Sequence, residues 1–221
     1  MMSHRRRPYA LDTSTFEVKA GILGSSRSFP ILGTMIIGIS IFKMEIIASR
    51  SLTKENIIGR DFSFEISEVI AKPYDHLSQG TEIITTRTTR KIKTYGFDEE
   101  TFADLDDPDA VIFTTMDRDG QVLGYAHAAK SWNNFVVLND IALDKSIRGQ
   151  GHGKRLLDAI VTWARQLGVA GIRLETQNNN VPACRLYKRY GFVFGGYDEF
   201  LYQGISEHRE ETAFFWYYLF S

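Results

Sequence analysis

A glycine-rich turn from Arg148 to Lys154, Arg-Gly-Gln-Gly-His-Gly-Lys, is the stretch whose residue types and spacing most clearly suggest chemistry. An apolar strand pattern at 135–143 precedes the turn, and an apolar helix pattern follows it as far as Leu167. The first N–H groups of a helix have no partner within the helix, and glycine lets a ligand approach the backbone closely. The turn therefore predicts a phosphate site, although a tight strand-to-helix connection would also use glycine.

The rest of the chain supplies the elements that must position this turn. A helix between the strands expected at 135–143 and 171–176 requires these two strands to be parallel. A second helix begins after Asn180, a good N-cap, has Pro182 in its first turn and ends at Gly191. The other expected strands are at 44–48, 61–70 (also compatible with a helix), 81–93, 110–116, 121–130, 192–197 and 212–219. The pattern predicts an α/β (α+β) fold.

Two motifs follow one another, separated by one helix and one strand: Arg148-x-x-Gly151-x-Gly153 and Asn180-x-x-Ala183-x-x-x-Tyr187-x-x-x-Gly191-Phe192. The first resembles the loop that binds the pyrophosphate of acetyl-CoA in GNAT-superfamily N-acetyltransferases, and the second resembles the later half of that family's signature. The resemblance implies the GNAT fold, a central mixed, mostly antiparallel sheet with two splayed parallel strands flanked by helices. It also implies acetyl-CoA as co-substrate, and no metal.

The resemblance implies direct acetyl transfer to an amine. Tyr187 would protonate the leaving thiolate, and a phenol with a pKa of about 10 suits that role. Glu175, with Asp140 as a near equal, would bind the ammonium group or accept its proton; both lie on the splayed strands. The residues expected to bind acetyl-CoA are Ile141, Ala142, Leu143, Arg148, Gly149, Gln150, Gly151, His152, Gly153, Lys154, Asn180 and Tyr187. The N–H of Ile141 would polarise the acetyl carbonyl.

Each of these side chains also has a structural interpretation. Tyr187 could pack the second helix onto the sheet, Asn180 could serve only as a helix cap, and the two carboxylates could be surface acids. His152 is expected to be an exposed loop residue that can touch phosphate. Because this family transfers acetyl groups without an acyl-cysteine, we interpret Cys184 as a packing residue.

A narrower resemblance, to the streptothricin acetyltransferases, covers about 62–220. It rests on Ser131-Trp132-Asn133, Asp140-Ile141-Ala142, the run 174–184, Gly195-Gly196-x-Asp198 and Phe215-Trp216-Tyr217. Those enzymes acetylate the β-lysine amine of streptothricin, so the implied function is antibiotic resistance. Many members carry an acid where this chain has Asn139, which weakens any mechanism that needs paired carboxylates there.

Other functions stay open at this point. The enzyme alternatives are an aminoglycoside or polyamine acetyltransferase and a ribosomal-protein-type N-terminal acetyltransferase. The non-enzyme alternative is an acetyl-CoA-binding module. Residues 98–109 contain seven acids and no base, which indicates either a solvated loop or a negative field that attracts a cationic acceptor. Such a field favours a small cationic amine as the partner.

Composition limits the remaining choices. The chain has 221 residues, a net charge of −1 and one cysteine. One cysteine excludes an internal disulfide and fits a reducing compartment, so we expect a cytoplasmic protein. We expect neither nucleic acid nor membrane as a partner, since no basic stripe occurs. The aromatic run 214–218 could serve a homodimer as well as the core.

Residues 1–43 differ from the rest of the chain. They contain six basic residues and two acids, and their apolar run at 29–42 is fourteen residues long, which is shorter than the roughly 20 that a membrane helix needs. We expect residues 1–43 to be an N-terminal extension that either is disordered or results from a mis-assigned start. We expect either that Met44 is the biological start or that residues 1–43 are dispensable, and that the GNAT N-acetyltransferase domain spans 44–221.

Overall fold

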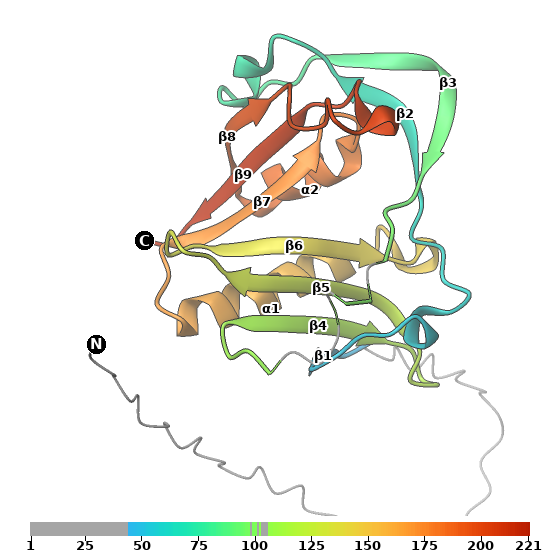
Figure 1. Ribbon diagram of the computed structural model, residues 1–221, viewed down its shortest axis with the longest axis vertical. Helices are drawn as coiled ribbons and strands as arrows, with labels where there is room; N and C mark the ends of the chain where they lie inside the picture. Colours follow the sequence, from blue (N-terminus) through green and yellow to red (C-terminus); the bar gives the residue numbers. More distant parts are fainter. Residues whose placement is uncertain (1–43, 98, 101, 103–105) are drawn as a thin grey trace, which may run out of the picture. The chain divides into compact units, whose positions relative to one another are not determined.

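The computed structural model describes residues 44–97, 99, 100, 102 and 106–221 (Figure 1). The expected N-terminal extension, residues 1–43, lies outside the described residues, as do Asp98 and Asp104 of the acidic segment. Among the described helices, none is long and apolar enough to cross a membrane.

A seven-stranded sheet, in the order β1-β4-β5-β6-β7-β9-β8, forms the framework of the described chain. Adjacent strands of this sheet are antiparallel, except that β6 and β7 are parallel. The strands are β1 (Ile46–Ser49), β4 (Ala110–Met116), β5 (Val122–Lys130), β6 (Val136–Leu143), β7 (Gly171–Gln177), β8 (Val193–Asp198) and β9 (Ala213–Leu219). The prediction of a mixed, mostly antiparallel sheet is confirmed.

A separate antiparallel ribbon pairs β2 (Phe64–Ile70) with β3 (Ile84–Lys93). The segment 61–70, which was compatible with strand or helix, is therefore a strand from Phe64. In the part of the chain that the structure describes, four short 3-10 helices connect the strands, at Glu55–Ile57, Tyr74–Leu77, Lys145–Ile147 and Ser206–His208.

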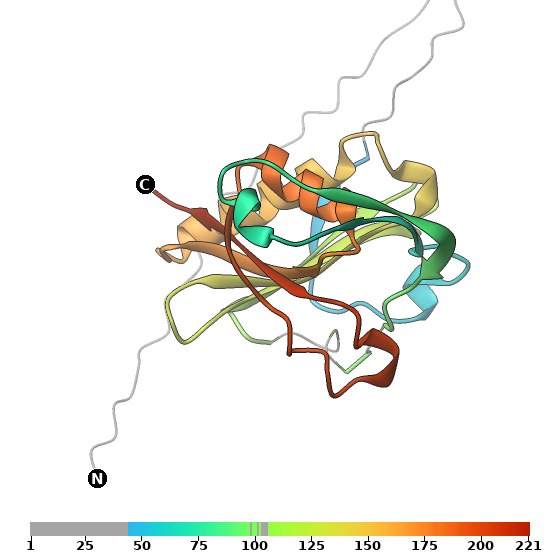
Figure 2. The ribbon, with the colours of Figure 1, turned by 90° about the horizontal axis from the view of Figure 1, so that it is seen from above.

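The described residues form two α-helices, α1 (His152–Gln166) and α2 (Val181–Tyr190), which occupy the predicted positions and lie on the same side of the sheet (Figures 1 and 2). α1 buries an apolar stripe that includes Leu156, Leu157 and Ile160. This stripe joins Trp216 of β9 and other buried residues in one hydrophobic cluster. Because α1 is held against the sheet along its length, the glycine turn at its start has a fixed place beside the end of β6.

Gly171 is a point of close contact between β7 and β9. A Cβ atom at this position would lie 2.3 Å from the backbone oxygen of Tyr218 and 3.1 Å from the Cα atom of Leu219. Since backbone atoms cannot turn away, we expect Gly171→Ala to lower the free energy of unfolding by about 1–3 kcal/mol, measured by urea denaturation. Gly204→Ala is the control, because no atom lies within 4 Å of a Cβ there. Equal stability of the two variants would contradict the prediction.

Candidate active site

The parallel strands β6 and β7 separate at one end. They pair from Val136 with Ile172 to Leu138 with Leu174. On its other edge β6 stays paired with β5, but a bulge leaves Asn139 without an opposite residue. A bulge bends its strand, so the chain diverges from β7 directly before Asp140. The splay expected near Asp140 is therefore present.

A cleft with a volume of about 870 Å³ opens where the strands separate, which is within the size range of small-ligand sites. The three predicted catalytic residues, Asp140, Glu175 and Tyr187, all line it. Gln150 instead turns its side chain to the Ser146 carbonyl, at 2.8 Å. The predicted acetyl-CoA contacts that line the cleft, besides Tyr187, are Ile141, Ala142, Leu143, Arg148, Gly149, Gly151, His152, Gly153, Lys154 and Asn180.

The glycine turn has the backbone that its sequence requires. Gly149 and Gly151 have φ values of 73° and 86°, in the left-handed region that glycine enters without steric cost. Gly151 is the N-cap of α1, where no side chain caps the helix and no acid lies in the first turn. The first N–H groups and the positive end of the helix dipole are therefore left for an anion.

The basic side chains of the turn are engaged with protein atoms. The guanidinium of Arg148 donates to the Leu143 carbonyl, at 2.9 Å from Nε and 2.8 Å from Nη2, and to the Ser63 carbonyl at 2.7 Å from Nη1. Burial lowers the pKa of Arg148. Lys154 forms an ion pair with Asp158 at 2.8 Å. Arg148 thus fixes the turn to β6 and to the entry of β2, and phosphate contact by these side chains stays a prediction.

His152 and Cys184 are both buried. His152 is the first residue of α1 and is only 7% exposed, so the expectation of an exposed loop residue is wrong. Burial and the neighbouring Arg155 lower the pKa of His152, which favours the neutral ring. Cys184 is buried as well, and burial raises the pKa of its thiol. A buried neutral thiol is a poor nucleophile, in agreement with a packing role.

Tyr187 reaches the cleft from α2. Its ring packs against Phe192 at a centroid distance of 5.6 Å, and the residue is buried. Burial is the main cause of a raised pKa, and Cys184, Tyr95 and Asp140 add to it. The phenol therefore keeps its proton at neutral pH, as a general acid must.

The N-cap of α2 has the predicted geometry. The side-chain oxygen of Asn180 accepts a hydrogen bond from the N–H of Ala183 at 3.3 Å. Because Asn180 also lines the cleft, capping places its amide at the cleft wall. The predicted contact with acetyl-CoA is compatible with the capping role.

The two candidate bases lie in different surroundings. Burial raises the pKa of Asp140, against the opposing effects of a hydrogen bond from the Tyr125 hydroxyl, at 3.1 Å, and one from the backbone N–H of Ile141. Glu175 is exposed and accepts a hydrogen bond from the Tyr202 hydroxyl. A general base works best when its pKa lies near the operating pH. The surroundings therefore favour Asp140 over Glu175 as the base.

Aromatic residues that the sequence analysis missed form the wall beside Asp140. The rings of Phe97 and Phe102 stack at 4.7 Å, and Phe102 meets Tyr125 edge-on at 5.3 Å. Phe62 also meets Tyr125 edge-on, at 5.5 Å. An ammonium group is attracted both to aromatic faces and to a carboxylate. This wall can therefore accept a cationic amine.

A hydrogen-bonded chain, also missed, includes two residues that line the cleft, Tyr95 and Gln177. The Tyr95 hydroxyl donates to Gln177, and Gln177 Nε2 donates to the Tyr202 hydroxyl at 2.7 Å. An ion pair between Lys93 and Glu211, at 2.6 Å and almost fully buried, ties the end of β3 to the segment before β9. The only sequence signal was the stretch Tyr95-Gly96-Phe97, which begins two residues after the end of the strand expected at 81–93.

Comparisons with known proteins agree with this geometry. Residues 78–192 match the model of the acetyltransferase (GNAT) family. A streptothricin acetyltransferase of Escherichia coli is 34% identical over 152 residues, which are 68% of this chain and 84% of that protein. A Bacillus anthracis protein described as a streptothricin acetyltransferase, solved with acetyl coenzyme A, has a TM-score of 0.67 at 30% identity, covering 80% of this chain and 100% of that one. Nourseothricin acetyltransferase has a TM-score of 0.65 at 27% identity, covering 79% of this chain and 97% of that one.

The chain therefore belongs to the acetyltransferase (GNAT) family, and it is an acetyl-CoA-dependent N-acetyltransferase. Within that family it is similar to the streptothricin acetyltransferases, as the motifs indicated. The expected GNAT fold is confirmed. A structural neighbour holds acetyl-CoA, whereas the roles of single residues in this chain stay predictions.

Proposed function

We propose that this enzyme acetylates a primary amine of a small cationic acceptor, most simply the β-lysine amine of streptothricin. One observation carries the proposal: a single cleft holds the buried Tyr187, the partly buried Asp140 and an aromatic wall beside that carboxylate. A carboxylate among aromatic rings suits an ammonium group. The similarity to streptothricin acetyltransferases supports the choice of acceptor.

The proposed reaction is direct transfer. Asp140 takes one proton from the acceptor ammonium and passes it to solvent, and the neutral amine nitrogen attacks the thioester carbonyl carbon. The C–N bond forms and the C–S bond breaks. Tyr187 gives its proton to the departing thiolate and regains one from the former amine nitrogen through water. The balance is one amide, one free thiol and one released proton.

The co-substrate would lie along the predicted contacts. The pyrophosphate would accept N–H bonds from the turn at Gly149–Gly153, and the pantetheine arm would run along Ile141–Leu143. The N–H of Ile141 serves the Asp140 carboxylate in this structure. Polarisation of the acetyl carbonyl by that N–H therefore requires it to exchange partners when acetyl-CoA binds.

Thiol release from acetyl-CoA tests the acceptor, with streptothricin, kanamycin, spermidine and a ribosomal N-terminal peptide as substrates. We expect kcat/KM for streptothricin to exceed that for the peptide by about 100-fold or more, because buried polar groups built for one substrate reject an analogue that leaves them unpaired. Turnover confined to kanamycin or spermidine would keep the cationic class and reject streptothricin. Turnover confined to the peptide would contradict the proposal.

A further inference from the structure

The hydrogen-bonded chain that contains Tyr95 continues to a carboxylate of the cleft. Glu175 and Gln177 lie two residues apart on β7, and therefore on the same face of that strand. The Tyr202 hydroxyl lies between them: it donates to the Glu175 carboxylate and accepts from Gln177 Nε2 at 2.7 Å. Gln177 Oε1 accepts from the Tyr95 hydroxyl. The chain of bonds thus runs from Glu175 to the wall of the cleft that Tyr95 forms.

The carboxylate at one end fixes the direction of every bond in this chain. An ionised carboxylate can only accept, so Tyr202 must give its proton to Glu175. The Tyr202 oxygen can then only accept, which turns the NH2 group of Gln177 toward Tyr202 and the amide oxygen toward Tyr95. The Tyr95 hydroxyl gives its only proton to that amide oxygen. The oxygen of Tyr95 is therefore left in the cleft wall as a hydrogen-bond acceptor.

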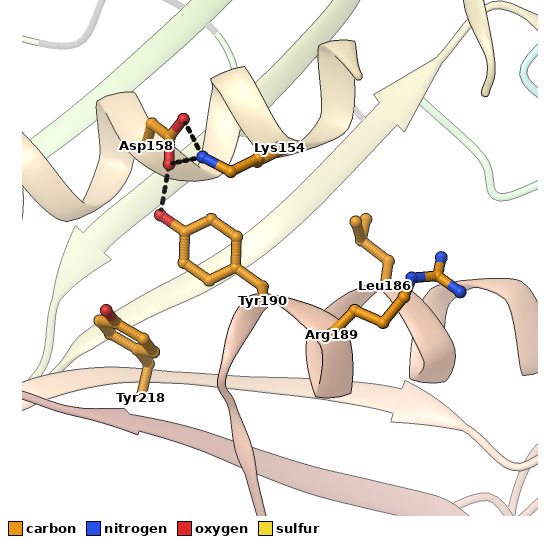
Figure 3. Close-up of a pocket in the computed structure, with 6 residues that line it drawn as sticks. All are labelled: Lys154, Asp158, Leu186, Arg189, Tyr190 and Tyr218. Atoms are coloured by element: carbon orange, nitrogen blue, oxygen red, sulfur yellow. Dashed lines mark hydrogen bonds and ion pairs between the residues drawn. The ribbon is translucent and has the colours of Figure 1, made fainter. Parts of the chain in front are cut away.

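The pair of Tyr190 and Asp158, beside the small pocket between α1 and α2, shows the difference (Figure 3). There the Tyr190 hydroxyl donates to the carboxylate at 2.9 Å, and Lys154 neutralises the same carboxylate at 2.8 Å. None of the other residues drawn in Figure 3 bonds to the Tyr190 hydroxyl. The direction that Asp158 sets is not passed on among them, whereas the direction that Glu175 sets is passed on into the cleft.

The ring of Tyr95 is held by the β2–β3 ribbon. Lys93 Nζ lies 4.9 Å from the ring centroid, and the Phe64 ring lies 5.6 Å from it. Phe64 and Lys93 are opposite each other in the ribbon, and Lys93 is itself fixed by its ion pair with Glu211. Tyr95 is therefore positioned at its ring as well as at its hydroxyl.

The hydroxyl of Tyr95 lies within electrostatic reach of the proposed catalytic residues. Although the residue as a whole is 43% exposed, protein atoms surround the hydroxyl, and this burial is the main cause of its raised pKa. A hydrogen bond with Asn180 opposes the shift, and Glu211 and Asp140 add to it. Tyr95 adds in turn to the raised pKa of Tyr187. The neutral phenol thus shares one part of the cleft with Asp140 and Tyr187.

We infer that Tyr95 is a specificity-determining residue of the acceptor site, and that its hydroxyl oxygen accepts a hydrogen bond from the reacting amine. Gln177 and Tyr202 are positioning residues that act through Tyr95. The inference rests on the proposed function, since it needs a cationic amine at Asp140. An ammonium group has three N–H groups, and the neutral amine keeps two. Tyr95 can therefore hold the nitrogen before and after Asp140 takes its proton.

Calorimetric titration of streptothricin into the full chain saturated with CoA tests this without turnover. Tyr95→Phe keeps the ring and removes the oxygen, so streptothricin should bind about 10-fold more weakly or worse, as for a lost hydrogen bond to a charged group. KM for streptothricin should rise similarly, with kcat changed less than about threefold, because the bond exists before and during the reaction. Tm and acetyl-CoA affinity should stay unchanged. Tyr197→Phe, outside the cleft lining, should change none of these quantities.

Tyr202→Phe separates positioning from packing. Without the Tyr202 hydroxyl the Gln177 amide can turn either way, so Tyr95 no longer has a fixed direction, and streptothricin should bind about 2- to 5-fold more weakly. In the Tyr95→Phe background the same substitution should cause no further loss, because no oxygen is left to orient. A merely structural role of Tyr202 would give the same loss in both backgrounds.

The variants and the wild type give distinguishable failures. Unchanged streptothricin affinity in Tyr95→Phe would overturn the inference, as would an equal loss of acetyl-CoA affinity, which would give Tyr95 a general role. Additive losses in the double variant would overturn the positioning role of Tyr202. If the wild type neither bound nor acetylated streptothricin, the proposed acceptor would fail before any variant is compared, and the inference would fail with it.

Discussion

Replacing Tyr187 by Phe is expected to lower kcat by about 10²- to 10⁴-fold, the usual contribution of a general acid. The affinity for acetyl-CoA should change little. The ring packs on Phe192, and Phe preserves that contact. Among the described residues none forms a hydrogen bond with the Tyr187 hydroxyl, so its loss leaves no buried partner unsatisfied. We therefore expect an unchanged Tm together with a large loss of turnover.

The same substitution separates the two interpretations of Tyr187. If the residue only packs α2 onto the sheet, Tyr187→Phe should leave kcat within about twofold of the wild type, and the acid assignment is wrong. Tyr197→Phe is a suitable control. Tyr197 lies on β8, packs edge-on against Tyr74 at 4.9 Å and is not a lining residue of the cleft. Tyr197→Phe should leave both kcat and Tm unchanged.

The direction of the pKa shift of Tyr187 can be tested by the pH dependence of kcat/KM. Burial favours the neutral phenol, so the phenol stays protonated above its usual pKa of about 10. Ionisation of Tyr187 in the free enzyme should therefore cause no decline of kcat/KM between pH 7 and about 10. A decline in that range that disappears in Tyr187→Phe would contradict this description of its surroundings.

The elements predicted to contact the co-substrate could be recognised from the sequence because each is marked by residues close together in the chain. Gly151 is followed at once by an amphipathic helix pattern, and Asn180 and Pro182 mark the start of α2 within three residues. The crossover between β6 and β7 fixed their parallel pairing. The exposure of His152 was predicted wrongly because it depends on how the left-handed Gly151 directs the chain into α1.

The residues on the acceptor side of the cleft could not be predicted from the sequence, because contacts between residues far apart in the chain bring them together. Arg148 holds the entry of β2 through a carbonyl 85 residues away, and Lys93 pairs with Glu211 across 118 residues. The bulge at Asn139 has no local signature, since the residues around it all read as one continuous strand. No spacing rule connects such residues, and only the folded chain brings Tyr95 and Phe97 to the cleft.

The second large effect is expected for Asp140→Asn. The amide can neither bind an ammonium as an ion pair nor take its proton, so kcat/KM for a cationic acceptor should fall by about 100-fold or more. Glu175→Gln is the comparison, because Glu175 is exposed. It should cost less than about 10-fold, since water screens an exposed charge. If Glu175→Gln lost more kcat/KM than Asp140→Asn, Glu175 and not Asp140 would be the base.

Because the pKa of Asp140 is raised, Asp140→Asn is expected to keep or increase stability while it lowers activity. Burial raises that pKa above the ordinary value of 3.8, so the folded state holds the proton more tightly than the unfolded state. The stabilising contribution of the protonated acid is full below the unfolded pKa, and it is lost as the pH rises through the folded pKa. At neutral pH the ionised carboxylate therefore costs stability, and Asp140→Asn should show a Tm equal to or above that of the wild type.

The pH profile then connects the two effects. If Asp140 must be ionised to act, the kcat/KM of the wild type declines as the pH falls through its raised pKa, and Asp140→Asn loses this acid limb along with most of its activity. If kcat/KM of the variant still declined at low pH as in the wild type, the ionisation that causes the decline would belong to another group. A gain in Tm with a loss of turnover would show that the fold tolerates an unfavourable carboxylate at the splay because the reaction requires it.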